Sequence, residues 1–418
     1  MADPLHILLV IDNFQPLIGG AEQAALESAR ALAQRGHRVD VLTMRKQADW
    51  PAEEQTDGLR VIRFDEAIPR RPFGRLLYEP ANAAAARRCL DGRLADEAYD
   101  ALLLHPIDAA FGAAQSRAAA RAVTIYCFHA PLAQEYWHHV RGVGGHEKRL
   151  LARAASCLTG AYAAWYRWSR QRATIHRSSA IACPSLYSRD LLSEVMQRLR
   201  HKRVEVIPWG VDAERFRPAD DTAALRRSLG WAPDEIVLFT ARRLVPRTGV
   251  GQLIRGFGLA SQERDDLRLM VAGDGPLRGC LEGLARRAGG AIEFLGFVPD
   301  DDLVRYFQAA DLFVLPSVAL EAFGLVTVEA LACGTPVLGT QRCATPEILA
   351  PLDERLLIPR DDAQAIAKAI LGPGIAIARE PGFPERCRQH VVERYTWERV
   401  AAAFEQLIRQ LLAERSGA

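Results

Sequence analysis

Short apolar runs alternate along the chain with longer segments in which apolar residues recur every three or four positions. Runs of four to eight apolar residues are typical of parallel strands buried on both faces, and the segments between them have the period and length of helices. This alternation predicts an α/β protein with two doubly wound units. Strands are expected in LHILLVID, HRVDVLT, LRVIRF, ALLLH, AVTIYCFH, AIACPS and VEVIPW, and then in IVLFTA, LRLMVAG, IEFLG, LFVLP, PVLGT and RLLI.

The length of 418 residues exceeds what one hydrophobic core usually serves, so two domains of about 200 residues are expected. The predicted link is PWGVDAERFRP, residues 208–218, where turn residues and charges follow a strand. We expect domains over residues 1–208 and 209–395, and a terminal segment over 396–418. A turn-rich stretch, GPGIAIAREPGFP, precedes TWERVAAAFEQLIRQLLAER, which has the periodicity of a strongly amphipathic helix.

Composition excludes several classes of protein. The net charge of +2 argues against nucleic acid as the main partner, because binding to phosphate backbones needs a large basic surplus. No apolar stretch approaches the roughly 20 residues of a membrane span, and the opening MADPLHILLVIDNF lacks the basic start of a secretory signal. The 8 cysteines contain no C-x-x-C pair, as expected of reduced thiols in a cytosolic chain without zinc or disulfides.

Glycines follow the first predicted strand. Gly19 and Gly20 open a long helical segment, where they allow close backbone approach and leave helix N–H groups facing a ligand. They are equally consistent with a tight turn alone. The full G-x-G-x-x-G fingerprint of dinucleotide binding is missing, which disfavours a nicotinamide cofactor.

Three arginines crowd the turn after the first strand of the second half, in TARRLVPRTGVGQLI. Open α/β sheets bind ligands at the carboxyl ends of their strands, and a guanidinium forks onto phosphate oxygens. Arg242, Arg243 and Arg247 therefore suit a diphosphate, although a solvated edge is the simpler alternative.

The segment EAFGLVTVE carries a carboxylate at each end of an apolar run. Glu321 is expected just before a helix, and the amides of Phe323, Gly324 and Leu325 would face an anion at the helix N-terminus. Glu329 lies further along that helix, at a position that would be apolar if the helix only packed. Two carboxylates on either side of a phosphate site suit a nucleoside diphosphate sugar. The alternative is that Glu321 only interacts with the helix dipole and that Glu329 is an ordinary surface charge.

The run EAFGLVTVEALACGTPVLGT resembles the E-x7-E segment of retaining glycosyltransferases of family 4, which have the GT-B fold. The similarity continues in GGAE, YCFHAP, PWGVD, RLVPRTGV, AGDGP, IEFLGFVPDDDLVRYFQAAD and YTWERV. The resemblance implies two Rossmann-like domains facing each other across a cleft. The first would bind the acceptor and the second the nucleotide sugar, and the C-terminal helix would pack back on the first.

The same resemblance implies roles for single residues. His129 and Glu321 correspond to the catalytic positions that contact the transferred sugar, Arg243 to the arginine on the diphosphate, and Glu329 to the residue on the ribose. The base would meet the backbone at Phe297 and Val298. The implied donor-binding set is Gly19, Gly20, Arg243, Arg247, Thr248, Phe297, Val298, Phe323, Gly324, Leu325 and Glu329.

One position departs from the family pattern. The family commonly has lysine five residues after the diphosphate arginine, and this chain has Thr248 there. Arg247 is the nearest replacement cation.

The chemistry expected of this site needs no metal. Negative charge grows on the β-phosphate as the glycosidic bond breaks, and arginines together with a helix N-terminus can stabilise it. Losing one such hydrogen-bond donor typically raises the activation free energy by about 3 kcal/mol. The DDD at 300–302 is expected as a helix cap and not as a metal site. The family resemblance implies that the transferred sugar keeps its anomeric configuration. Because no carboxylate nucleophile is evident, we expect the acceptor to attack on the face that the phosphate leaves, with the departing phosphate as base and no cofactor besides the nucleotide sugar.

Basic and aromatic residues are mixed in the long segment 141–177. Such a segment suits an anionic membrane interface and equally an ordinary surface helix, and the sequence leaves both open. The acceptor is accordingly a lipid-linked saccharide, a glycan end or a small molecule. The protein would be cytoplasmic, at the inner face of the membrane if the segment docks there. Its basic residues are Arg141, Lys148, Arg149, Arg153, Arg167, Arg170, Arg172 and Arg177.

Two other classes of function remain open. A nicotinamide-dependent oxidoreductase would share the doubly wound domains but would need the dinucleotide fingerprint. A non-catalytic binding subunit on the same scaffold is also compatible, because fold does not fix function.

Overall fold

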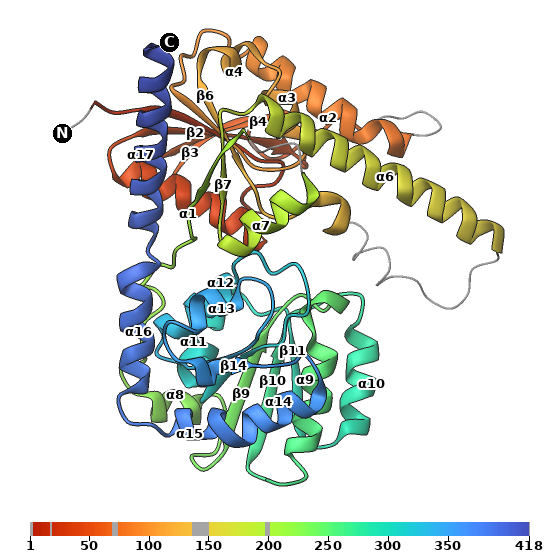
Figure 1. Cartoon of the computed structure of the whole chain (residues 1–418), viewed down its shortest axis with the longest axis vertical. Coiled ribbons are helices and arrows are strands. Elements are labelled where there is room, and N and C mark those ends of the chain that lie inside the picture. Colours follow the sequence, from red (N-terminus) through yellow and green to blue (C-terminus); the bar gives the residue numbers. More distant parts are fainter. Residues whose placement is uncertain (1–2, 17–18, 69–73, 136–149, 197–200, 418) are drawn as a thin grey trace. The chain divides into compact units, whose positions relative to one another are not determined.

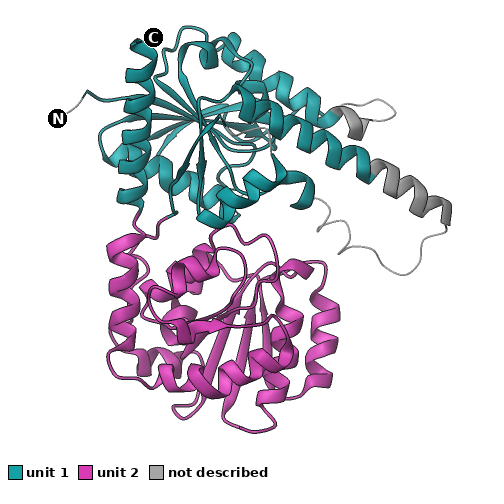
Figure 2. Ribbon diagram, in the orientation of Figure 1, with its two compact units in different colours: residues 1–137, 147–209, 397–418 teal, residues 138–146, 210–396 magenta. Residues whose placement is uncertain are grey.

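The computed structural model describes residues 3–16, 19–68, 74–135, 150–196 and 201–417, with the backbone alone for 74–77 and 150–159. The chain forms two compact units, coloured separately in Figure 2. Unit 1 combines residues up to 135 with 150–209 and the segment from Trp397 onward, and unit 2 contains Gly210–Thr396.

Unit 1 is built on an eight-stranded sheet with the order β3-β4-β2-β1-β5-β6-β7-β8 (Figure 1). All neighbours are parallel except β3 and β4, which are antiparallel. The strands are β1 (His6–Val10), β2 (Arg38–Arg45), β3 (Glu53–Thr56), β4 (Leu59–Asp65), β5 (Ala101–Leu104), β6 (Val123–Cys127), β7 (Ala180–Cys183) and β8 (Arg203–Val206).

Helices cross between these strands, and local sequence sets where several of them begin. Ser116 accepts a hydrogen bond from the Ala119 amide to cap α4, and Ser185 caps α7 in the same way. The helices of unit 1 are α1 (Gly20–Gln34), α2 (Gly74–Asp91), α3 (Asp108–Ala113), α4 (Arg117–Arg121), α6 (Leu150–Arg177), α7 (Leu186–Val195) and α17 (Trp397–Ser416).

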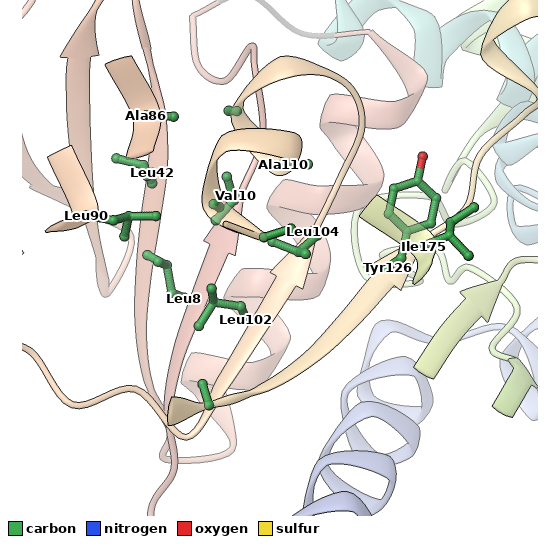
Figure 3. Packing of buried hydrophobic residues seen from close by; sticks show 14 of the residues in the cluster. Leu8, Val10, Leu42, Ala86, Leu90, Leu102, Leu104, Ala110, Tyr126 and Ile175 are labelled. Carbon is green, nitrogen blue, oxygen red and sulfur yellow. The ribbon is translucent and has the colours of Figure 1, made fainter. Parts of the chain in front are cut away.

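The core of unit 1 forms where strand side chains meet the helices on one face of the sheet. Leu8, Leu42, Leu102 and Leu104 project from β1, β2 and β5 toward Ala86 and other residues of α2, α3 and α6 (Figure 3). Strands buried on both faces explain why the sequence shows continuous apolar runs and not alternation.

Unit 2 contains a six-stranded parallel sheet with the order β11-β10-β9-β12-β13-β14. Its strands are β9 (Ile236–Ala241), β10 (Leu267–Ala272), β11 (Ala291–Gly296), β12 (Leu312–Leu315), β13 (Val337–Thr340) and β14 (Leu357–Ile358). Its helices are α8 (Thr222–Ser228), α9 (Val250–Ala260), α10 (Arg278–Ala288), α11 (Asp300–Ala309), α12 (Leu325–Ala332), α13 (Thr345–Leu349), α14 (Ala363–Ala369), α15 (Ile375–Ala378) and α16 (Phe383–Arg394). Short 3₁₀ turns occupy Pro246–Thr248 and Glu354–Leu356.

Each of the thirteen predicted apolar runs contains a strand, so the predicted α/β class with two doubly wound sheets is confirmed. One strand was missed and two local expectations are wrong. The charged strand β3 was not predicted. GPGIAIAREPGFP is partly helical, with a π-turn over Ile370–Gly374 followed by α15. Asp300–Asp302 form the first turn of α11 behind the N-cap residue Pro299, and none of the three is the cap.

Helix α17 completes unit 1 from the far end of the chain. It packs against α1, and Arg35 of unit 1 donates to the Glu405 carboxylate at 2.8 Å. Its buried face contains Val400, Phe404 and Leu407, at the spacing of one helical stripe.

Candidate functional site

Two loops meet at the carboxyl end of the sheet in unit 2, where β9 and β12 finish. Gly249 makes their close approach possible, because a Cβ there would lie 1.8 Å from the Pro316 carbonyl oxygen and its φ is +72°. The Val318 amide donates to the Arg247 carbonyl at 3.0 Å. The arginine-rich turn and the loop leading to Glu321 are thus fixed to each other by backbone contacts.

Arg242 and Glu321 form a buried ion pair between these loops. Their side chains are 8% and 13% exposed. The Ser317 hydroxyl donates to the same carboxylate oxygen, Oε2, at 2.9 Å. Burial alone would raise the pKa of Glu321, but the charge and hydrogen bond of Arg242 outweigh burial and hold that pKa below its usual value. Glu321 is therefore an ionised acceptor.

Arg242 also presents a nitrogen that is ready for a further contact. Its Nη1 atom is buried and has no hydrogen-bond partner among the described residues. A buried unpaired guanidinium nitrogen is costly unless a ligand or water satisfies it. The sequence analysis named Arg242 among three arginines suited to a diphosphate, but the donor-binding set implied by the family resemblance did not include it.

The other predicted residues of the turn have different surroundings. Arg243, expected on the diphosphate, is exposed, and Arg247 donates to the Leu320 carbonyl at 3.3 Å. The Thr248 hydroxyl donates to the Arg243 and Val245 carbonyls at 3.0 and 2.8 Å, so its polar group is used inside the turn. Thr248 therefore serves the shape of the turn.

Helix α12 begins directly behind Glu321, as the sequence predicted. Gly324 is the N-cap with a φ of +89°, and no side chain caps the helix. Phe323 is buried with its ring 5.7 Å from that of Tyr395, and Leu325 is the first helical residue. Because no side chain caps α12, its N-terminus is suited to an anion.

Glu329 lies on α12, eight residues after Glu321, and is half-buried. Burial, with a smaller effect of the Asp300 charge, raises the pKa of Glu329 to about 8, and Arg215 opposes the rise. Phe297 follows β11 and is 78% exposed, and Val298 is partly buried. No direct contact joins Glu329 to Glu321 among the described interactions.

Unit 1 places its predicted residues at the carboxyl ends of its own strands. Gly19 is the N-cap of α1 and Gly20 its first residue. The Glu22 carboxylate accepts from the Gly19 amide at 3.1 Å and from the Asn13 side chain at 3.3 Å. This helix N-terminus already holds a carboxylate, so an incoming phosphate would compete with Glu22.

His129 follows β6 and contacts a second histidine that the sequence analysis did not single out. The His105 Nδ1 and His129 Nε2 atoms lie 2.9 Å apart, and the His129 ring is 5.3 Å from that of Trp209. Burial lowers the pKa of His129 to about 4 and that of His105 well below its usual value. Both rings are neutral near pH 7. The signal was present in the sequence, because ALLLH and YCFH both end a strand with histidine.

Two further carboxyl groups lie at the same edge of the unit 1 sheet. The Asp12 carboxylate accepts the amides of Ile107, Asp108 and Ala109 at 2.7–3.0 Å and so fixes the start of α3. Burial, with the charges of Asp12 and Glu79, raises the pKa of Asp108 to about 9. Asp108 is therefore a neutral carboxylic acid that can donate a hydrogen bond.

Two matches to protein families coincide with these two sets of residues. The model described as Glycosyl transferases group 1 matches residues 221–372, and the model described as Glycosyltransferase Family 4 matches residues 18–215. Their order along the chain is that of the two units. The chain belongs to glycosyltransferase family 4.

Proteins similar to this glycosyltransferase include mannosyltransferases. The GDP-mannose-dependent monoacylated alpha-(1-6)-phosphatidylinositol monomannoside mannosyltransferase of Corynebacterium glutamicum is 30% identical over 206 residues, which are 47% of this chain and 54% of that protein. The match thus spans about half of that relative. The phosphatidyl-myo-inositol mannosyltransferase of Mycobacterium leprae is 28% identical over 397 residues, 92% of this chain and 91% of that protein.

Solved structures identify the fold of the glycosyltransferase. Sucrose-phosphate synthase from Thermosynechococcus elongatus matches with a TM-score of 0.77 and 24% identity, over 98% of this chain and 100% of that chain. The two doubly wound units therefore have the GT-B fold.

The basic segment of the glycosyltransferase is only partly described. Within α6, Arg167 pairs with Glu79 at 2.9 Å, and the Arg170 guanidinium lies 4.1 Å from the Phe111 ring. These two arginines contact side chains of unit 1 itself. Arg141, Lys148 and Arg149 lie outside the described residues, as does the side chain of Arg153.

The remaining described part of α6 presents aromatic and basic residues outward. Trp165 is 59% and Tyr162 41% exposed, and Arg177 is exposed. Arg172 lies over the Trp168 ring at 5.3 Å. Among the helices that the structure describes, none combines the length and hydropathy needed to cross a bilayer.

One group of metal-type ligands occurs among the described residues, in unit 1. His6, Asp40 and Glu97 bring one ligand atom each within 4.8 Å of one another. Arg60 donates to Glu97 at 2.6 Å, and His6 Nε2 lies 3.1 Å from Asp40. With a guanidinium among the ligands, the group fits an ion-pair network better than a cation site.

Proposed function

We propose that this chain transfers a hexose from a nucleoside diphosphate sugar to a hydroxyl of a polyol or lipid-linked acceptor. The observation that carries the proposal is the buried Arg242–Glu321 pair, with Ser317 on the same carboxylate, beside the uncapped N-terminus of α12. A sugar diphosphate requires groups of these kinds, namely a cation with a free nitrogen, a fixed carboxylate and a row of helix amides.

Each group has a separate role in this proposal. Glu321, ionised and fixed by Arg242, accepts hydrogen bonds from hydroxyls of the transferred sugar. The amides from Phe323 to Leu325 and the Nη1 atom of Arg242 stabilise the charge that grows on the β-phosphate. Glu329 holds the ribose hydroxyls. Arg243, Arg247 and the backbone at Phe297 and Val298 complete the donor site as the family resemblance implies.

Unit 1 would supply the acceptor side, with His129 contacting the transferred sugar. Gly19 and Gly20 would meet the donor phosphates once these displace the Glu22 carboxylate. The neutral acid Asp108 lies at the same sheet edge and suits an acceptor hydroxyl, because a protonated carboxyl both donates and accepts.

The names of similar proteins favour mannose as the transferred sugar and GDP-mannose as the donor. The Corynebacterium glutamicum relative is named as GDP-mannose-dependent, and the Mycobacterium leprae relative as acting on phosphatidyl-myo-inositol. An inositol-containing or lipid-linked acceptor follows for this chain as part of the proposal. We further propose that transfer retains the anomeric configuration and proceeds without a metal ion.

Calorimetry with GDP, UDP and ADP tests the donor site, and incubation with GDP-mannose and phosphatidylinositol tests transfer. We expect GDP to bind at least tenfold more tightly than the other two, and the product to be an α-mannoside by NMR, equally fast with and without a chelator. Equal affinities for the three nucleotides would refute the choice of guanosine. Absence of binding to all three would refute the glycosyltransferase proposal.

Membrane contact through the outer face of α6 is a separate proposal. Exposed Trp165 and Tyr162 with Arg177 suit the interface of an anionic bilayer. Sedimentation with vesicles should show binding that increases with the fraction of phosphatidylglycerol and weakens in Trp165→Ala. Binding that is independent of lipid charge would refute it. The matched control is Trp231→Phe, because Trp231 is 3% exposed in unit 2.

A further inference from the structure

Two histidines at the ends of adjacent parallel strands form a closed pair in unit 1. β5 and β6 pair in parallel, with Leu104 opposite Tyr126, and His105 and His129 follow them. The His105 Nδ1 atom lies 2.9 Å from the His129 Nε2 atom. The two remaining ring nitrogens, His105 Nε2 and His129 Nδ1, are buried and have no partner among the described residues.

Neutral imidazoles allow two arrangements of this pair, and each leaves one nitrogen with a proton and no acceptor. If His129 donates to His105, the unpaired N–H belongs to His105, whose side chain is 4% exposed. If His105 donates to His129, the unpaired N–H is the buried Nδ1 of His129, a residue that is partly exposed and whose ring lies 5.3 Å from that of Trp209.

The arrangement in which His105 donates to His129 has the lower free energy once a ligand binds, because the ligand can accept the unpaired N–H. Buried donors without a partner are rarer in proteins than buried acceptors without one. His129 is partly exposed whereas His105 is 4% exposed, so a ligand can approach the ring of His129 and not that of His105. The first arrangement would leave an N–H enclosed beside β5 permanently.

We propose that His105 is a positioning residue that donates its Nδ1 proton to Nε2 of His129, so that His129 presents Nδ1–H to a hydroxyl oxygen of the transferred sugar. His105 does not touch the sugar in this proposal. It fixes which nitrogen of His129 carries the proton and the orientation of the ring. The sugar contact rests on the proposed function, whereas the proton arrangement does not.

Nitrogen NMR of the full-length chain with 15N-labelled histidine tests the proton arrangement directly. His129→Ala assigns the signals of His129. We expect these signals to show a protonated Nδ1 and an unprotonated Nε2 at pH 7. A protonated Nε2 on His129, or an even mixture of the two forms, would overturn the proposal whether or not the chain transfers a sugar.

Two substitutions of His105 separate positioning from packing. In His105→Asn the amide nitrogen can occupy the place of Nδ1 and still donate, whereas His105→Leu fills similar space without a donor. We expect His105→Leu to lower kcat about tenfold with unchanged GDP affinity, which is the loss expected for one hydrogen bond, and His105→Asn to restore most of it. Equal activity of the two variants, with both folded by circular dichroism, would refute the positioning role.

The sugar contact has its own test in the same spectra. The Nδ1 signal of His129 should shift with GDP-mannose and not with GDP. Equal shifts with both would remove the sugar contact, and no shift with either would contradict it as well. Absence of transfer in the unchanged chain would refute the proposed function, while the proton arrangement would still be measured.

Discussion

Replacing Glu329 by glutamine should remove a pH dependence from the stability of this protein. Burial raises the pKa of Glu329 from 4.5 to about 8 in the folded chain. Between these values the folded state holds a proton on this side chain that the unfolded state has lost. The folded state is therefore favoured less as the pH rises, and this group lowers the stability throughout that window.

The size of the effect follows from proton linkage. One such group lowers the free energy of unfolding by at most about 1.4 kcal/mol for each pH unit, or about 5 kcal/mol over the whole window. Glutamine occupies the same space and does not titrate. The difference in stability between Glu329→Gln and the unchanged chain should grow in favour of glutamine from pH 5 to pH 8.

Urea unfolding at pH 5, 6, 7 and 8 measures this difference, because the other titrating groups are common to both chains. Glu321→Gln is the matched control. The pKa of Glu321 is lowered, so the stability that this carboxylate provides is lost only as the pH falls below its ordinary value of 4.5. The control should therefore differ from the unchanged chain by a constant amount between pH 5 and 8.

The same carboxyl group predicts proton release when nucleotide binds. Ribose hydroxyls that donate to Glu329 favour its ionised form, so binding of GDP at pH 7 should release close to one proton. Calorimetry in buffers of different ionisation enthalpy measures this number. Parallel stability curves for Glu329→Gln and the unchanged chain would refute the raised pKa of Glu329, and the absence of proton release would refute its ribose contact.

Three further substitutions test the turn beside Glu321. Arg242→Met should lower the free energy of unfolding by about 3 to 5 kcal/mol, because it leaves the Glu321 carboxylate buried and unpaired, and adding Glu321→Leu should recover most of the loss. Arg243→Met should change stability by less than about 0.5 kcal/mol, since Arg243 is exposed; a larger loss would show that Arg243 is the buried cation. Gly249→Ala should cost about 3 kcal/mol or more by thermal melting, whereas Gly279→Ala, with nothing within 4 Å of its new methyl group, should not destabilise.

The strands could be predicted because burial on both faces produces continuous apolar runs in the sequence. The position of Glu321 follows from them, since it lies in the loop between a predicted strand and a predicted helix. Every apolar run became a strand, and the loop LEAFG precedes a helix as expected. Strand β3, with the sequence EEQT, has no such mark, because it is a short edge strand that pairs with β4 alone. Its position depends on a neighbour and not on its own composition.

The choice between adjacent arginines could not be predicted from residue types. Arg242 and Arg243 carry the same group, and the strand end turns one inward and the other outward. The structure turns Arg242 toward Glu321 and leaves Arg243 exposed, and the contact of Arg243 with a diphosphate, which the family resemblance implies, stays a prediction. Likewise, Thr248 stands where the family commonly has a lysine, and in the structure its hydroxyl donates hydrogen bonds to carbonyls of the turn.

Helix α17 has a consequence for how this protein is made. Residues from Trp397 onward pack against α1 of unit 1, whereas the described part of unit 2 is one stretch from Gly210 to Thr396. During synthesis the ribosome releases all of unit 2 before the partner of α1 exists. The middle of the polypeptide can thus reach its final form first, and a nascent chain stalled before Trp397 would expose to chaperones the side of α1 against which α17 later packs.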